Sequence, residues 1–254
     1  MLAKMCQLGR TAWVAATLAL MSIAGTAIAG HVEGRYTFYS DPLTIAGNKA
    51  ALLPGQLADY ANITNKMSGL GGIAVDIVGL GGPLDHSDFI FRAGNSMSPS
   101  LWEPVSEAPT VSVLASGGAA GSDRVAVAFG TDVVRDRWLE ITVRANEATG
   151  LSSPDVFYFG NLAGDVTGDL FVTPIDVLTV VNFLNANGAQ FVGVDSPLDV
   201  TGDGHVSPLD SLLINDELNA VGPKSLVVVP EPTTLGLLAM GGLAMLRASR
   251  RLMV

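Results

Sequence analysis

The chain has 254 residues, of which 24 are acidic and 14 are Lys or Arg, and its formal net charge is -10. A chain this acidic, without a basic block, lacks the electrostatic footprint of a nucleic-acid-binding protein. Its single cysteine excludes a disulfide framework and a cysteine-rich zinc site. The mean hydropathy is nevertheless +0.41, which indicates that apolar residues are concentrated in segments outside the soluble fold.

The first 29 residues have the pattern of a signal peptide. Lys4 and Arg10 precede an apolar run over residues 11–23, and Ala27 and Ala29 provide the small side chains that signal peptidase requires. The alternative is a buried N-terminal helix. The order of charge, apolar run and small residues favours export through the inner membrane, with cleavage after Ala29.

The other end carries the motif VPEPTT at residues 229–234, then an uncharged run over residues 235–246, then Arg247, Arg250 and Arg251. This order resembles the PEP-CTERM sorting signal of Gram-negative bacteria, which implies recognition by an exosortase-type sorting enzyme at the cell envelope. The alternative is a retained tail anchor. The uncharged run would span about 18 Å as a helix, less than the hydrocarbon core of about 30 Å, which favours processing over anchoring.

The strongest internal signal is a duplicated acidic loop, DVTGDLFVTPID at residues 165–176 and DVTGDGHVSPLD at residues 199–210. Both loops place oxygen-bearing side chains at positions one, three, five, nine and twelve, and position seven offers a backbone carbonyl. This is the ligand pattern of an EF-hand calcium loop. We predict two Ca²⁺ sites, with the ligands Asp165, Thr167, Asp169, Phe171, Thr173 and Asp176 in the first and Asp199, Thr201, Asp203, His205, Ser207 and Asp210 in the second.

The two loops differ at their sixth position, where the first has Leu170 and the second has Gly204. The sharp turn there favours a positive φ, which costs a residue other than glycine about 1–2 kcal/mol. We therefore expect the first site to bind calcium more weakly than the second.

Each loop ends in the signal for the start of a helix. Thr173 and Ser207 are N-cap residues, a proline follows each of them, and the closing aspartate falls at the third helical position, as in a capping box. Apolar residues then recur at helical spacing. These residues are Val177, Leu178, Val181 and Leu184 in the first segment and Leu212, Leu213 and Leu218 in the second. We expect them to form the core between two short helices.

The two DVTGD openings, the closing aspartates and the helices that follow resemble the type I dockerin over residues 164–221. Dockerins are small calcium-dependent modules that bind cohesin domains, often in polysaccharide-degrading complexes. The resemblance implies a cohesin-like domain or another envelope protein as partner, with contacts at Pro174, Ile175, Asn182, Pro208, Leu209 and Asp216. The pairs Pro-Ile and Pro-Leu depart from the small polar residues that often read the partner in dockerins. An open alternative is that calcium only holds this module together.

The body, residues 30–160, is glycine-rich and contains short runs with β-strand character, several alternating with a period of two. The runs cover residues 35–39, 73–78, 88–92, 110–114, 124–129, 138–144 and 156–159. They predict a mainly β fold with an antiparallel β-sandwich, to which residues 48–53 add a helical turn. Segments such as GRYTFYS and RWLEITVRA resemble the envelope and extracellular β-domains of planctomycete-type proteins.

The body contains no HExxH, GxSxG or phosphate-loop motif. The acidic cluster of Asp85, His86 and Asp88 lies in a turn-like segment, where such side chains are usually solvated rather than catalytic. We therefore predict a non-enzymatic protein whose module docks the sandwich to a partner at the cell envelope, cell surface or extracellular matrix. One alternative is a carbohydrate-binding or polysaccharide-degrading component of a cohesin-bearing complex, with Trp102 stacking on the sugar. Another is a purely structural matrix component.

These signals divide the chain into five parts. They are a signal peptide at 1–29, a β-sandwich at 30–160, a dockerin-like calcium module at 161–221, a linker at 222–228 and a sorting signal at 229–254.

Overall fold

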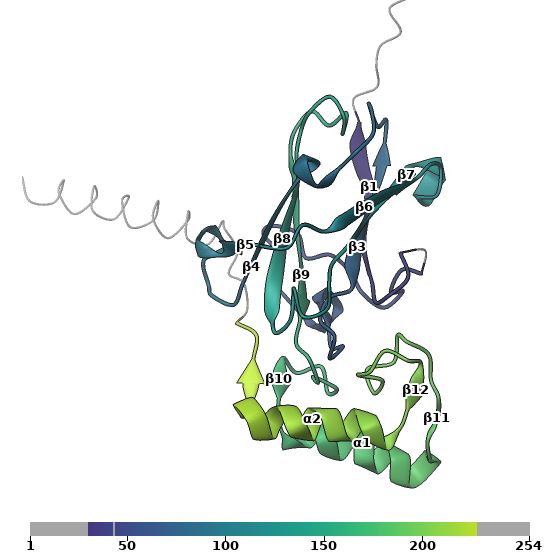
Figure 1. The fold of residues 1–254 in the computed structure, drawn as a ribbon, viewed down its shortest axis with the longest axis vertical. Helices are drawn as coiled ribbons and strands as arrows, with labels where there is room; N and C mark the ends of the chain where they lie inside the picture. The colour runs from purple at the N-terminus through teal and green to yellow at the C-terminus, as the bar shows by residue number, and fades with distance from the viewer. Residues whose placement is uncertain (1–29, 43, 228–254) are drawn as a thin grey trace, which may run out of the picture.

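The structure is a computed structural model, and it describes residues 30–42 and 44–227. The predicted signal peptide and sorting signal lie outside the described residues. The described chain has a layered β-body at one end and a pair of helices at the other, and the two acidic loops lie between them (Figure 1). We refer to residues 30–162 as the body and to residues 163–221 as the module.

The body is a sandwich of two sheets, as predicted. The first sheet has the order β1 (His31–Phe38), β3 (Gly72–Val78), β7 (Asp123–Ala128) and β6 (Thr110–Leu114). The second has the order β2 (Ile63–Thr64), β9 (Asp155–Asn161), β8 (Arg137–Val143), β4 (Phe89–Gly94) and β5 (Glu103–Pro104). Neighbouring strands are antiparallel except for the short β2, which runs parallel to β9. All the predicted strands are present, which confirms the mainly β fold class, and β1 begins earlier than predicted.

The short 3-10 turns of the body are η1 (Tyr60–Asn62), η2 (His86–Asp88), η3 (Pro99–Leu101) and η4 (Ala119–Gly121). All four lie in connections between strands. The one that concerns the module is η1, which immediately precedes β2.

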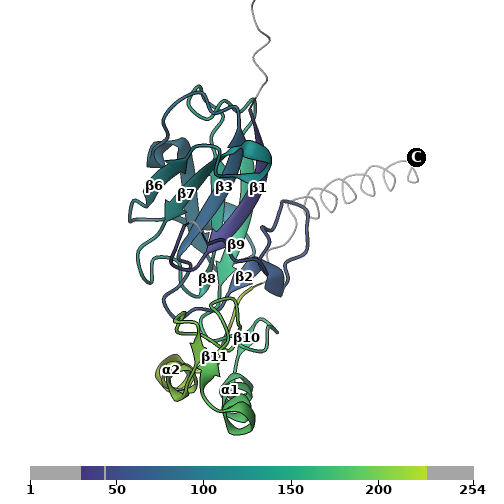
Figure 2. The same cartoon turned by 90° about the vertical axis from the view of Figure 1, so that its right-hand side faces the viewer.

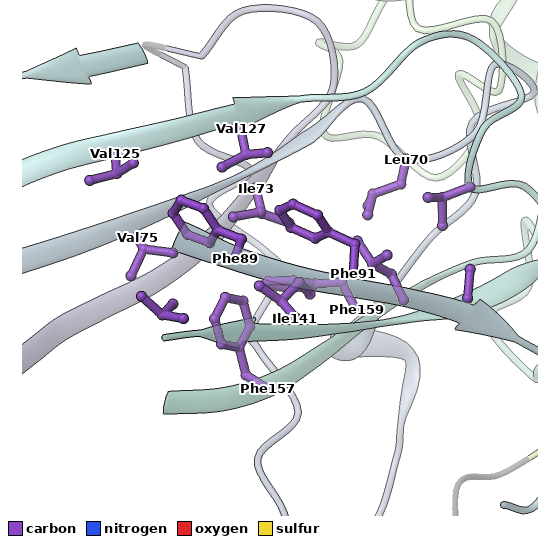
Figure 3. Close-up of a cluster of buried hydrophobic side chains, with 14 of the residues drawn as sticks. Leu70, Ile73, Val75, Phe89, Phe91, Val125, Val127, Ile141, Phe157 and Phe159 are labelled. Carbon is purple, nitrogen blue, oxygen red and sulfur yellow. The ribbon is translucent and has the colours of Figure 1, made fainter. Parts of the chain in front are cut away.

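The core between the sheets consists of the side chains that alternate inward from both layers (Figure 3). From the first sheet come Ile73, Val75, Ile77, Val125 and Val127, and from the second come Phe89, Phe91, Ile141, Phe157 and Phe159. Burying a side chain of this size stabilises the fold by about 1.5–3 kcal/mol. The period-two alternation at Val125 and Val127 therefore marked the inward face of β7, whereas Val113, which alternates in the same way on β6, is 43% exposed.

The prediction of a helical turn at residues 48–53 was wrong. Leu52 instead forms an isolated antiparallel bridge with Tyr158, and their backbone N–H and carbonyl groups bond in both directions at 3.0 and 2.9 Å. Pairing with the neighbouring β9 satisfies backbone groups that one helical turn would leave open.

Trp102 is only 4% exposed, so the prediction that it stacks on a sugar was also wrong. Its ring lies edge-on to Tyr158 with centroids 6.0 Å apart, and its indole N–H donates to the Ser96 carbonyl at 3.1 Å. The ring occupies the space that Gly94 leaves, since a Cβ there would lie 2.4 Å from the indole Cδ1 atom.

The module consists of α1 (Pro174–Asn187), α2 (Pro208–Val221) and two short ladders. One ladder pairs β10 (Phe171–Val172) with β13 (Lys224–Ser225), and the other pairs β11 (Gln190–Phe191) with β12 (His205–Val206). Both helices start as predicted, with Thr173 and Ser207 as N-caps and a complete capping box. The helices lie side by side at the end of the molecule (Figure 2).

The predicted apolar stripes do not describe the buried helix faces correctly. The fully buried apolar side chains of the helices are Val180 and Ile214, equivalent positions that the prediction omitted, whereas Leu178 and Leu212 are 53% and 51% exposed. Val180 and Ile214 join Val200 and Val206 in a cluster that continues into the body. The buried face is therefore set by packing against the loops and the body as well as by the partner helix.

Residues 222–228 were expected to be a linker, but their described part is held by both units. Lys224 and Ser225 form the strand β13, which pairs with β10 of the module. The Val227 carbonyl accepts a hydrogen bond from the indole N–H of Trp138 in the body at 2.8 Å. This stretch therefore fixes the module against the sandwich.

Candidate functional site

The first residues of the two loops, Asp165 and Asp199, are fully buried and organise the turns that follow them. The Asp165 carboxylate accepts hydrogen bonds from the N–H groups of Gly168 and Leu170 at 2.8 and 3.1 Å. Asp199 accepts from the equivalent N–H groups of the second loop at 2.8 and 2.9 Å. Both loops therefore wrap around their first carboxylate in the same way.

The twelfth residues, Asp176 and Asp210, are also fully buried and join each loop to its helix. Asp176 accepts from the N–H groups of Val166, Thr167 and Thr173 at 2.9, 3.0 and 2.8 Å. Asp210 accepts from the N–H groups of residues 201 and 207 at 3.1 and 2.8 Å. Each aspartate thus closes a loop and a capping box at once.

The sixth positions of the loops both have a left-handed backbone, with φ of +69° at Leu170 and +84° at Gly204. Leu170 holds this conformation at a cost of about 1–2 kcal/mol, which glycine avoids. The predicted difference in backbone strain is therefore present in the structure. The weaker calcium binding expected of the first loop stays a prediction.

The remaining predicted ligands lie nearer the surface of the loops. Thr167, Asp169, Phe171, Asp203 and His205 are exposed, whereas Thr173, Thr201 and Ser207 are half-buried. Among the described residues, no three acidic, histidine or cysteine side chains form a metal cluster by themselves. An ion in either loop would therefore also use hydroxyl and carbonyl oxygens. Such a donor set of hard oxygens suits calcium.

The charge of the first loop also suits a cation. Burial, followed by the negative charges of Asp176 and Asp169, raises the pKa of Asp165 to about 6, although two backbone N–H groups lower it. A buried carboxylate with this environment carries a negative charge that the surrounding protein does not offset. A bound divalent cation would offset it.

We expect the response of the protein to calcium to grow between pH 5 and pH 7. Because the pKa of Asp165 is raised in the fold, its protonated form stabilises the calcium-free fold at low pH, and this contribution is lost as the pH rises through about 6. Calcium binds the ionised form, so its affinity rises over the same range. The measurement is the melting temperature with and without calcium at pH 5, 6 and 7.

The matched variant for this pH dependence is Asp165→Asn, which has no proton to lose. It is expected to flatten the pH dependence of the calcium-free melting temperature between pH 5 and pH 7. If the calcium-free melting temperature of this variant depends on pH as strongly as that of the unaltered chain, Asp165 is not the cause of the pH dependence.

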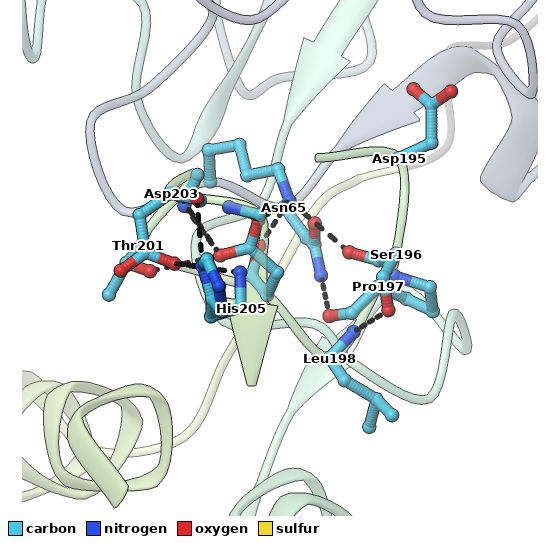
Figure 4. A network of polar contacts seen from close by, with 12 residues as sticks. Asn65, Asp195, Ser196, Pro197, Leu198, Thr201, Asp203 and His205 are labelled. Carbon is cyan, nitrogen blue, oxygen red and sulfur yellow. Dashed lines mark hydrogen bonds and ion pairs between the residues drawn. The ribbon is translucent and has the colours of Figure 1, made fainter. Parts of the chain in front are cut away.

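Residues 65–67, which follow β2 in the body, bond to both loops; Figure 4 shows their contacts on the side of the second loop. The side-chain amide of Asn65 donates to the Asp165 carbonyl at 3.0 Å and to the Pro197 carbonyl at 2.6 Å. The Met67 N–H donates to the Val200 carbonyl at 2.9 Å. A single body segment therefore sets the position of both loops.

Between these two residues, Lys66 directs its buried side chain at the second loop. Its ammonium donates to the Asp199 carbonyl and, at 3.2 Å, to the Ser196 carbonyl. It also lies 3.7 Å from Oδ2 of Asp199 and 4.8 Å from the ring centre of Tyr39. Burial lowers the pKa of Lys66 below its ordinary value, and the negative charges of Asp199 and Asp210 only partly counter this.

The first loop meets an aromatic ring instead. Tyr60 packs over Gly168, where a Cβ would lie 2.9 Å from the ring. Lys49 also lies over this tyrosine, with Nζ 3.5 Å from the ring centre, and donates to the Tyr60 carbonyl at 3.1 Å. Among the ion pairs of the described residues, none involves Asp165.

A cluster of charged groups fastens α2 to the body. Glu217 accepts from Arg135 at 2.5 Å and from Lys224 at 2.7 Å, and Lys224 also donates to Asp136 at 2.7 Å. Burial raises the pKa of Glu217, but the hydrogen bond and charge of Lys224, with the charge of Arg135, outweigh this and lower it. Sequence reasoning missed this cluster and the Asn65–Lys66 contacts, because most of the bonds join residues about 80 or more positions apart.

The residues predicted to contact a partner all lie exposed on the two helices. They are Pro174, Ile175, Asn182, Pro208, Leu209 and Asp216. Ile175 and Leu209 are 62% and 49% exposed, and they are flanked by the exposed Leu178 and Leu212. Two of these four apolar side chains come from each helix, at equivalent positions of the repeat. We call Ile175, Leu178, Leu209 and Leu212 the apolar helix face. Because β10 pairs with β13 and β11 with β12, the helices are antiparallel, and its two pairs of side chains lie toward opposite ends of the helix pair.

The acidic cluster of the body has capping roles in the structure. Asp85 accepts from the Ser87 N–H at 2.7 Å, and Asp88 accepts from the Asp85 N–H at 2.9 Å. Asp88 also accepts from the side-chain amide of Asn146 at 2.8 Å. These bonds fix the turn η2 before β4.

Residues 163–219 match the family model of the dockerin type I domain, and residues 228–251 match that of the PEP-CTERM protein-sorting motif. The chain therefore contains a type I dockerin domain and a PEP-CTERM motif, as predicted from the loops and the tail. No curated protein and no solved structure matched the chain. The motif implies export to the cell envelope or surface. No helix among residues 30–42 and 44–227 has the length and hydropathy of a membrane span.

Proposed function

We propose that this protein is a non-catalytic component of the cell envelope or surface, whose dockerin domain binds two calcium ions and docks the β-sandwich to a cohesin domain. The observation that carries the proposal is the apolar helix face. Four large aliphatic side chains, repeated in pairs on α1 and α2, remain exposed, and these helices form the end of the molecule opposite the sandwich (Figure 1). Exposed apolar pairs of this kind, one near the start of each helix, mark candidate interaction sites.

The calcium part of the proposal is supported by the buried acids of the loops. Asp165, Asp176, Asp199 and Asp210 are completely removed from solvent, and the whole donor set consists of hard oxygen atoms. Calcium binding would offset the repulsion between the carboxylates of each loop and hold the helices in the orientation that presents the apolar helix face.

The sorting part is supported by the matched motif at residues 228–251. An exosortase-type enzyme would process this end at the envelope after signal peptidase has removed the predicted leader. The sandwich would then be held outside the membrane, where calcium and a cohesin-bearing partner are accessible.

The test is the binding of the processed chain to a panel of purified cohesin domains, by surface plasmon resonance with calcium and with a chelator. We expect a cohesin to bind only with calcium. The variant Ile175→Asp/Leu209→Asp is expected to weaken binding at least about tenfold, because it places two charges in the apolar helix face. Both side chains are exposed, so the fold should remain intact.

The matched control is Leu57→Asp, which adds a charge at an exposed leucine of the body, 76% exposed. It should bind cohesin as the unaltered chain does. Binding that persists in the chelator, or that the double helix variant leaves unchanged, would contradict the proposed docking surface.

A further inference from the structure

The module contains no Lys or Arg of its own. No Lys or Arg lies between Arg144 and Lys224, whereas nine acidic residues lie from Asp165 to Glu217. Any lysine or arginine side chain that contacts the module must therefore come from the rest of the chain. Among the described ion pairs of lysine and arginine, the pair of Lys66 with Asp199 is the one that involves a predicted calcium ligand.

The position of this lysine is fixed from several sides. The Lys66 side chain is fully buried, donates to the carbonyl groups of Asp199 and Ser196, and lies over the ring of Tyr39. The neighbouring Asn65 and Met67 are bonded to the loops as well. The ammonium is therefore held beside the first carboxylate of the second loop and cannot swing into solvent without opening the interface.

We propose that Lys66 is a built-in counter-cation of the second loop, through which the body sets the calcium affinity of the module. Without calcium, its charge pairs with the buried Asp199 carboxylate and keeps the loop closed. With calcium bound, the same charge repels the ion at short range in a site of low polarity. Both effects reduce the gain from binding calcium. This inference rests on the proposed calcium binding.

The first loop provides an internal comparison. Its sequence is nearly the same, but Tyr60 rather than an ammonium covers it, and Asp165 has no partner among the described ion pairs. Lys66 thus lowers the affinity of the second loop, as the strain at Leu170 lowers that of the first. Removing the lysine is therefore expected to widen the difference between the two sites.

The experiment is calcium titration of the processed chain by calorimetry, together with melting temperatures with and without calcium. An Asp169→Ala background disables the first loop, so that the second is observed alone. In this background, Lys66→Met is expected to tighten calcium binding about tenfold or more and to lower the melting temperature of the calcium-free chain. The matched control is Lys49→Met, a buried lysine that donates to the Tyr60 carbonyl and not to a loop, and it should leave the affinity unchanged.

A merely structural lysine would give a different pattern. Lys66→Met would then lower the melting temperature equally with and without calcium and leave the affinity unchanged or weaker, and this result would overturn the inference. If Lys66→Met does not fold, Lys66→Gln keeps one N–H donor without the charge, and it too must bind calcium more tightly. If the unaltered chain binds no calcium, the proposed function itself fails. If it binds two ions with affinities that neither variant tightens, only the role of Lys66 fails.

Discussion

Replacing Asp176 with alanine is expected to lower the free energy of unfolding of the calcium-free protein by about 3–5 kcal/mol. The carboxylate is fully buried and accepts hydrogen bonds from three backbone N–H groups of the first loop. Alanine leaves these donors without an acceptor, which costs about 1–3 kcal/mol of stability for each donor that stays buried. It also removes one of the two hydrogen bonds of the capping box of α1. The measurement is urea unfolding followed by circular dichroism.

The control for this prediction is Asp169→Ala in the same loop. Asp169 is exposed and accepts from the N–H of Phe171 at 3.0 Å, so its loss should change the calcium-free stability by no more than about 1 kcal/mol. Asp169 is nevertheless a predicted calcium ligand. The Asp169→Ala variant should therefore be stabilised less by calcium, while its calcium-free fold remains nearly as stable as that of the unaltered chain. Equal losses of calcium-free stability in the two variants would contradict the structural role of Asp176.

The strands of the body were predictable from short runs rich in β-branched and aromatic residues, several with period-two alternation, although β3 and β9 are buried on both faces. The alternation at Val125 and Val127, for example, identified the inward face of β7. It could not show which strands are neighbours. The pairing of Leu52 with Tyr158, and the burial of Trp102 beside the same tyrosine, depend on contacts between residues that are far apart in the chain.

The loops and helix starts were also predictable, because their signals are local. A capping box requires residues three positions apart, and the positive φ at Leu170 follows from the geometry of a twelve-residue loop. The contacts of Asn65 and Lys66 with the second loop could not be predicted, since they join positions about 130 residues apart and leave no periodic pattern. The exposure of Leu178 and Leu212 had the same cause, because the body helps to determine which helix face is buried.

Gly168→Ala is expected to destabilise the protein by about 3 kcal/mol, whereas the equivalent Gly202→Ala should cost only about 1 kcal/mol. Both glycines have a positive φ, +74° and +80°, so both variants carry similar backbone strain. They differ in what a Cβ would meet. At Gly168 it would lie 2.9 Å from the ring of Tyr60, and at Gly202 its nearest neighbour is the Lys66 side chain at 3.8 Å. Urea unfolding without calcium measures both costs.

The difference between these two variants measures how tightly the body packs on the first loop. If Tyr60 is the cause, adding Tyr60→Ala to Gly168→Ala should cost less than the sum of the two single changes, because the alanine methyl then has room. Tyr60→Ala added to Gly202→Ala should be additive, since Gly202 does not face the tyrosine. Equal costs for the two glycine variants, or additivity in both pairs, would mean that the dockerin domain is not packed on the sandwich as the structure describes.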